Sequence, residues 1–364
     1  MHSPPDKSNP GQPLSIGELQ GMGLLNQAPG AMAFRNATSP RLPLLREAPS
    51  LEELRVKMPE LGGISPEAIL DRFATLCRVV APRREREPGE AVDSGDDVLL
   101  DVVGFANGRL IPFSARAEWR TEATPDPLLP GFFEAVVRAR VGESVAVDLV
   151  LPDDYAVESL RGVPARFDVK MKAAYQVTLL GESSPELFAA LGRGGTLDEV
   201  MEYIAGELIA QRDAQYLWDF QDHVMREVAR RTHVEVPRSL IDEEIRQRWA
   251  EAEYPILVSL GLPHERVREG LDGWLLDDST RSELEYRLRL ALGLRAIAER
   301  DHIQSERESA EELFNSLAER AQLSRVELGR LLQSDKNLGR RFDTLTMHTA
   351  VVSHILSKAD VSRE

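Results

Sequence analysis

Hydrophobic and polar positions divide the chain into stretches with different periods. Residues 65 to 80 carry apolar side chains every three or four positions, after Ser65 as a candidate N-cap and Pro66 at the first helical position. This pattern predicts a helix with one buried face. Cys77 lies on that face and is expected to be a small core residue rather than a nucleophile. The apolar positions are Ile69, Leu70, Phe73, Leu76, Cys77 and Val80.

Between Ala91 and Val177 the pattern changes to short strands. One apolar run ends at Asn107-Gly108, a dipeptide typical of hairpin turns. The run ARFDVKMKAAYQVTLL alternates, with Phe167, Val169 and Met171 on one face. Because LPGFFEAVVRA indicates one short helix between the strands, this part is expected to be a small α+β domain of antiparallel strands around a helix.

The period is helical from Pro185 almost to the end of the chain. A break at Val234–Pro237 separates a first long helix from those that follow, and no fixed-length repeat indicates a solenoid. The expected helices cover Leu197–Val224, Leu284–Ile303, Leu313–Leu332 and Leu345–Leu356.

Two stretches fit neither pattern. Residues 1 to 48 are rich in Pro, Gly, Ser and Asn, which predicts a disordered tail; a short interaction segment around Leu19–Leu25 is the alternative. The charged, proline-bounded stretch Pro82–Glu90 is interpreted as a domain boundary. The expected organisation is therefore a tail over 1–50, a linker strand and helix over 51–82, a sheet domain over 83–180 and a helical domain over 181–364.

Composition narrows the classes of partner and site. Lys plus Arg is 44 and Asp plus Glu is 60, and the resulting net charge of -16 should repel a phosphate backbone, so we expect no nucleic-acid partner. One cysteine excludes an internal disulfide and a cysteine-built metal site. No apolar run has the length of a membrane span, and the N-terminus lacks the features of a signal peptide. We expect a cytoplasmic protein without a membrane partner.

Common catalytic motifs are missing from the sequence. It contains no HExxH, CxxC, GxxxxGK[ST] or GxSxG, and no GxGxxG after a strand. The histidines are scattered, and acidic pairs such as Asp153-Asp154 are interpreted as solvated turns or caps. We therefore expect no metal and no cofactor.

The most informative segment is Pro127–Met171. It combines an apolar-apolar-Pro-Gly-Phe turn at Leu128–Phe132, a Val-Gly-Glu before a strand at Val141–Glu143, and Leu-Pro-Asp-Asp-Tyr at Leu151–Tyr155. In this order and spacing the segment resembles the FKBP-type peptidyl-prolyl isomerase domain of trigger factor, a family of bacterial chaperones. The resemblance extends from about Leu51 to Ala359.

The flanking resemblance implies the rest of the architecture. ISPEAILDRFATLCRVV is similar to the family's linker helix, and THVEVPRSLIDEEI and SELEYRLRLALGLRAIAERDHIQ are similar to its C-terminal chaperone domain. This implies an all-α domain with arms that binds unfolded or nascent polypeptides. The family's ribosome-docking domain, with its Gly-Phe-Arg-x-Gly-Lys loop, has no counterpart in residues 1–50 beyond LEELRVKMPE, so we expect no ribosome docking by that loop.

The same resemblance implies candidate site residues. Carried over position by position, an aromatic pocket that isomerises X–Pro bonds would use Trp119, Phe132, Tyr155 and Phe167 as its catalytic residues. Substrate would contact Ile111, Leu128 and Leu129 there, and Trp274 and Leu275 within the exposed-looking segment Gly270–Ser279.

Three departures from the family pattern leave a second function open. Pro112 lies where single-domain FKBPs have a pocket aspartate, Ile111 lies where the family usually has phenylalanine, and Phe113-Ser114 replaces a glycine pair. The alternative to an isomerase chaperone is therefore a catalytically inactive FKBP-like module that escorts one dedicated partner protein. In that case the aromatic residues would be core residues only.

Overall fold

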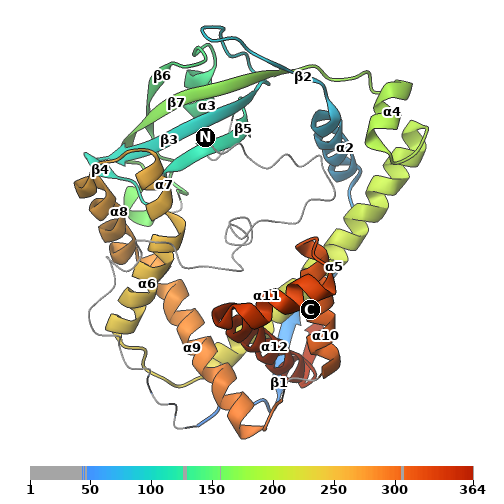
Figure 1. Cartoon of the computed structure of the whole chain (residues 1–364), viewed down its shortest axis with the longest axis vertical. Helices are drawn as coiled ribbons and strands as arrows, with labels where there is room; N and C mark the ends of the chain where they lie inside the picture. Colours follow the sequence, from blue (N-terminus) through green and yellow to red (C-terminus); the bar gives the residue numbers. More distant parts are fainter. Residues whose placement is uncertain are drawn as a thin grey trace. The chain divides into compact units, whose positions relative to one another are not determined.

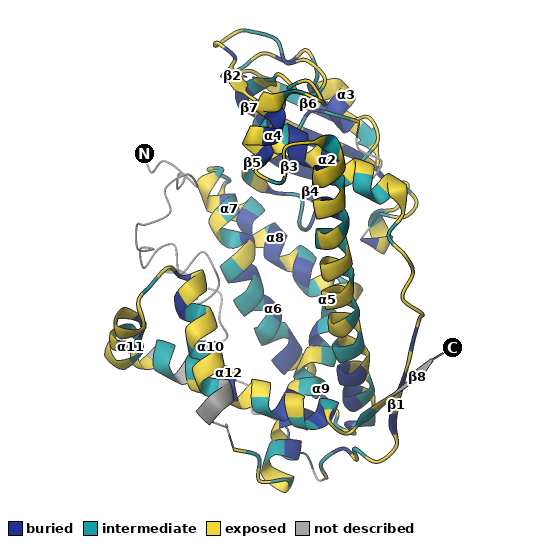
Figure 2. Cartoon of the chain, turned by 90° about the vertical axis from the view of Figure 1, so that its right-hand side faces the viewer, coloured by how far each residue is buried: buried dark blue, intermediate teal, exposed yellow. Residues whose placement is uncertain are grey.

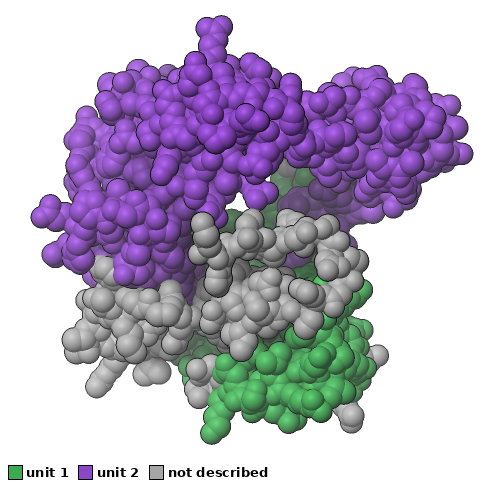
Figure 3. All heavy atoms as spheres, turned by 45° about the horizontal axis from the view of Figure 1, so that its top comes forward, with its two compact units in different colours: residues 1–59, 220–243, 283–364 green, residues 60–219, 244–282 purple. Residues whose placement is uncertain are grey.

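The structure, a computed structural model, describes residues 43, 45, 47–125, 129–155, 157–304 and 307–363. Two compact units make up the chain (Figure 3). The first, here the sheet unit, comprises residues 60–219 and 244–282, and the second, the helical unit, comprises residues 1–59, 220–243 and 283–364. The α+β fold class is confirmed, with one small antiparallel sheet and helices over most of the C-terminal half. The expected tail lies mostly outside the described residues.

The sheet is centred on two long strands (Figure 1). Strand β7 pairs antiparallel with β2, β3 and β6, and β3 also pairs with β4 and β5. Asn107 and Gly108 form the β3–β4 turn with φ angles of 52° and 74°, as the dipeptide predicts. The strands are β2 (Arg83–Glu85), β3 (Asp97–Ala106), β4 (Arg109–Leu110), β5 (Arg116–Glu122), β6 (Ser144–Val150) and β7 (Pro164–Val177).

One face of the sheet packs on the short helix α3 (Phe132–Val136). From Pro164 to Ala173, strand β7 alternates between exposed and buried residues, so that Phe167, Val169 and Met171 face the core as predicted. Phe132 and Leu100 are also buried there.

A second core lies in the sheet unit where α2 (Pro66–Val80) meets α4 (Pro185–Leu191) and the start of α5 (Leu197–Arg231). The Ser65 side chain accepts a hydrogen bond from the Ala68 N–H at 3.1 Å, which confirms the predicted N-cap. Cys77 is a buried core residue, as predicted, and burial raises the pKa of its thiol. Leu70 was expected on the buried face but is 57% exposed, because α4 and α5 leave the flank of that face uncovered.

Three further helices contribute to the sheet unit. Helix α6 (Arg238–Ala252) follows the predicted break at Val234–Pro237, and its residues 244–252 belong to this unit. Helices α7 (Tyr254–Ser259) and α8 (His264–Leu276) complete it, together with the 3₁₀ turn η2 (Glu158–Leu160).

The helical unit departs from prediction in two places. The single helix expected over Leu313–Leu332 is instead two, because a capping box between Ser324 and Glu327 starts a new helix. The strand β8 (Ala359–Arg363) was not predicted; it pairs in parallel with β1 (Leu54–Met58), Leu54 opposite Ala359. The unit's own helices are α9 (Asp278–Arg300), α10 (Arg307–Arg320), α11 (Arg325–Ser334) and α12 (Lys336–Leu356).

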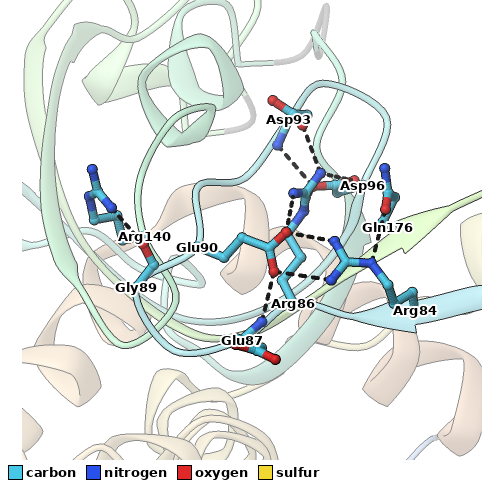
Figure 4. A network of polar contacts seen from close by, with 9 residues as sticks. All are labelled: Arg84, Arg86, Glu87, Gly89, Glu90, Asp93, Asp96, Arg140 and Gln176. Atoms are coloured by element: carbon cyan, nitrogen blue, oxygen red, sulfur yellow. Dashed lines mark hydrogen bonds and ion pairs between the residues drawn. The ribbon is translucent and has the colours of Figure 1, made fainter.

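A buried ion pair lies where the chain enters the sheet (Figure 4). Arg86 Nε donates to Asp96 Oδ2 at 2.5 Å and Arg86 Nη2 to Asp96 Oδ1 at 3.1 Å, and both residues are buried. Asp93 and Glu90 accept further bonds from the same guanidinium. The stretch interpreted only as a domain boundary therefore also holds an ionic cluster. Among the described residues, no helix is both long and apolar enough to cross a membrane.

Candidate functional site

The sheet brings together three of the four aromatic residues expected to form the pocket. Phe132, on α3, lies edge-on to Phe167, on β7, with ring centroids 5.7 Å apart. Trp119, on β5, lies 6.2 Å from Phe132. Phe133, which the sequence analysis did not single out, joins the same cluster at 5.1 Å from Phe132. Gly131 begins α3 with a φ of 89°, which explains why glycine precedes Phe132.

Burial separates these residues into two groups. Phe132 is 1% exposed and Phe167 is buried, so both belong to the core of the sheet. Trp119, Tyr155 and Leu129 are half-buried and pack against that core, so they are the members of the set that a ligand can reach. Burial raises the pKa of the Tyr155 phenol, although the positive charge of Arg116 acts in the opposite direction. Because the net shift is upward, the phenol stays protonated at neutral pH. Leu128 lies outside the described residues.

The loop that carries the three departures from the family pattern is held by contacts within the sheet and by contacts with the helices. The Ser114 hydroxyl donates to the Ile111 carbonyl at 2.7 Å and accepts from the Gly104 N–H at 3.1 Å. Ile111 and Pro112 are both buried. Pro112 lies against α8, where a Cβ added to Gly273 would come within 2.8 Å of its ring.

Glu253 anchors this loop to the helices. Its Oε1 accepts the Phe113 N–H at 3.0 Å, and its Oε2 accepts the indole N–H groups of Trp274 at 2.8 Å and Trp249 at 3.2 Å. Phe113 has a φ of 65° and stacks on Trp274 with ring centroids 4.4 Å apart. Burial raises the pKa of Glu253, although the three donors act in the opposite direction. The sequence analysis missed Glu253.

A cavity of about 180 Å³ opens beside this loop, within the sheet unit. Its walls come from the β3–β4 turn, the Ile111–Pro112 loop, η2 and α8. None of the four predicted aromatic residues lines it, whereas Ile111, Val157 and Leu160 do. One wall of this cavity is thus contributed by α8, a helix of the C-terminal half.

The segment Gly270–Ser279 is less exposed than predicted. Trp274 is buried, because it packs between Phe113 and Glu253, so the expectation that it is exposed was wrong. Leu275 is half-buried, and the neighbouring Leu276 is exposed. The most exposed apolar side chains in the sheet unit's part of α5 are Leu217 and Trp218, each 66% exposed, with Tyr203 and Ile209 also exposed on that helix. Exposed residues occur along much of α5 (Figure 2).

No cluster of three or more His, Cys, Asp or Glu side chains suited to a metal occurs in the described part of the chain. The candidate site presents an apolar and aromatic surface next to the Tyr155 phenol. Such a surface can bind and desolvate a peptide.

Comparison with known proteins agrees with the resemblance seen in the sequence. Residues 196–357 match the family described as bacterial trigger factor protein C-terminus. Trigger factor of Halothermothrix orenii is 29% identical over 232 residues, covering 63% of this chain and 53% of that protein. Trigger factor of Geobacter sulfurreducens is 27% identical over 304 residues, covering 82% of this chain and 68% of that protein. The match thus spans about half to two thirds of each relative's length.

Solved structures were also found to be similar. A trigger factor chaperone covers 87% of this chain, and this chain 73% of it, at 13% identity and a TM-score of 0.33. A peptidyl-prolyl cis-trans isomerase from Pseudomonas syringae pv. tomato matches over its full length and 32% of this chain, at 18% identity and a TM-score of 0.21. At these TM-scores neither likeness supports a statement about function.

Proposed function

We propose that this chain is a chaperone that binds nonnative polypeptides, because residues 196–357 match the C-terminal domain of bacterial trigger factor. The observation that carries the proposal is the pair of exposed apolar side chains Leu217 and Trp218 on α5, at the start of this domain. Large apolar side chains that are mostly exposed to water favour binding of other apolar chains. Many weak contacts of this kind suit clients that share no sequence.

Serine at both Leu217 and Trp218 is expected to weaken binding of an unfolded client about tenfold, because the loss of two exposed apolar contacts costs over 1 kcal/mol of binding energy. Binding of a reduced, carboxymethylated protein, followed by fluorescence anisotropy, measures this. The matched control places serine at Leu70 and Val79, which are exposed apolar residues on α2. An equal loss in the control, or none in either variant, contradicts a binding surface on α5.

We propose prolyl isomerisation as a second activity, supported by the grouping of Trp119, Tyr155 and Leu129 on the aromatic core. Rotation about an X–Pro bond has a barrier of about 18–20 kcal/mol. This barrier is lowered by a site that excludes water and binds the twisted imide more tightly than the planar one. Such a site needs neither a nucleophile nor a metal. Burial of Ile111 in the core of the sheet and of Pro112 against α8 supports the alternative, an inactive module that escorts one partner.

Alanine at both Trp119 and Tyr155 is expected to reduce isomerase turnover of a proline peptide at least about tenfold, since it removes the reachable wall of the pocket. A protease-coupled assay on the full chain measures the rate, and client binding should stay unchanged. Tyr175→Ala is the matched control, because Tyr175 is a half-buried tyrosine of β7 that is not in the aromatic cluster. Absence of turnover in the unsubstituted chain would establish the inactive module instead.

A further inference from the structure

The helical unit contains an apolar groove that the proposed function leaves unassigned. It lies between α9 and α12 and has a volume of about 500 Å³, within the range of about 300–1,000 Å³ typical of ligand pockets. Leu294 and Val351 are buried at its base, while Met347 is exposed. The other lining residues are Arg287, Leu290, Ala291, Arg295, Ala298, Glu299, Ile303, Thr344 and His348.

The N-terminal part of the chain is fixed close to the end of this groove. Arg300, the last residue of α9, donates a hydrogen bond from Nη1 to the carbonyl of Pro49 at 2.9 Å, and Pro49 is buried. Three groove residues, Ala298, Glu299 and Ile303, lie within three positions of Arg300. Pro49, the residue through which the N-terminal sequence joins this unit, is therefore held beside the groove.

The tethered sequence contains one strongly apolar stretch. Residues 16–25 read IGELQGMGLL, with Ile16, Leu19, Met22, Leu24 and Leu25 among small and polar residues and a single charge at Glu18. We propose that residues 16–25 occupy the α9–α12 groove and compete there with client polypeptides. Only the competition with clients rests on the proposed chaperone function.

The tether makes this occupant more favourable than a free peptide. Seventeen residues separate Leu25 from Pro43, and a random-coil chain of that length would span about 20–25 Å on average. Along α9, Arg300 and Leu290 are about 15 Å apart at 1.5 Å per residue. The groove is thus within reach, and a short flexible tether supplies an effective concentration of about a millimolar.

A fluorescence contact experiment on the full chain tests the proposal directly. In a Cys77→Ser background, Arg295→Cys at the rim of the groove is labelled with bimane, and Leu24→Trp supplies a quencher that acts only at contact. Arg295 has a side chain 69% exposed, so labelling leaves the base of the groove free. We expect Leu24→Trp to lower the bimane fluorescence at least about twofold, because the tether keeps the groove largely occupied.

Two further measurements, and one outcome of the first, decide between occupants. Val326→Cys, at a site 61% exposed on α11 away from the groove, should show no quenching, and equal quenching at both sites overturns the proposal. Quenching between separately labelled and Trp-bearing chains would identify a second copy as the occupant and overturn it too. No quenching at Arg295→Cys would leave the groove to external partners and overturn it.

The competition with clients is tested on a separate variant. Serine at Leu19, Leu24 and Leu25 should strengthen binding of an unfolded client about tenfold, since the tethered competitor is removed. Unchanged client affinity overturns competition. If no variant binds clients but quenching persists, the proposed chaperone function fails while the groove assignment stands.

Discussion

Replacing Glu253 with alanine is expected to lower the free energy of unfolding by about 3–5 kcal/mol, because three buried donors lose their acceptor together. These donors are the Phe113 N–H and the indole N–H groups of Trp249 and Trp274. Each unpaired buried donor costs about 1–3 kcal/mol, and the side chain also fills space between α6 and α8. Urea unfolding of the full chain, followed by tryptophan fluorescence, measures the change.

The matched control is Glu269→Ala, on α8. Glu269 forms ion pairs with Arg109 and Arg266 and is only partly buried, so its loss should cost at most about 1 kcal/mol. A cost for Glu253→Ala no larger than for Glu269→Ala would contradict the role assigned to Glu253. If the Glu253→Ala chain remains folded at low temperature, protease cleavage between Leu110 and Ser114 should increase, because the loop has lost its anchor.

Glu253 also predicts how stability depends on pH. Burial raises its folded-state pKa above the ordinary value of 4.5, so the folded chain retains this proton where the unfolded chain has lost it. The contribution of this group to stability is therefore fully present below pH 4.5 and is lost as the pH rises through the folded-state pKa. Glu253→Gln should remove this part of the pH dependence, and an unchanged pH profile in that variant would contradict the buried carboxyl.

Local patterns predicted the elements whose stabilising contacts are local. Asn107-Gly108 specifies its hairpin by backbone conformation alone, and Ser65 with Pro66 specifies the start of α2 through adjacent residues. The capping box at Ser324 and Glu327 was a readable signal for the start of α11 and was overlooked. Strand β8 was not predictable in the same way, because its partner β1 is about 300 residues away in sequence.

The candidate site shows the same division. Trp119, Phe132 and Phe167 could be grouped because a resemblance over the whole sheet fixes their spacing. Glu253 could not be assigned to the site from the sequence, since its partner Phe113 is 140 positions away and no local pattern links the two residues. The one signal was an acidic residue four positions after Trp249, in front of the apolar run YPILV. For the same reason, the burial of Trp274 could not be anticipated: its cover comes from a loop of the sheet.

Arg86→Ala is expected to cost about 3–5 kcal/mol of unfolding free energy, since it leaves the Asp96 carboxylate buried without its counter-charge. Among the described residues, the Asp96 carboxylate would then keep the hydrogen bond from the Asp93 N–H, at 2.8 Å. The pair fixes the entry of β2 into the sheet, so the loss should fall on the sheet unit (Figure 4). Differential scanning calorimetry of the full chain measures it.

Two companion variants separate the charge from its packing. Arg166→Ala removes an exposed arginine that pairs with Asp168 on the same sheet, and should change stability by less than about 1 kcal/mol. Arg86→Met combined with Asp96→Leu removes both charges and retains apolar volume, so it should be less destabilised than Arg86→Ala alone. The double variant could instead be the less stable of the two. In that case the Arg86–Asp96 attraction outweighs the cost of burying two charges. The cluster at this boundary would then stabilise the sheet by ion pairing rather than by packing.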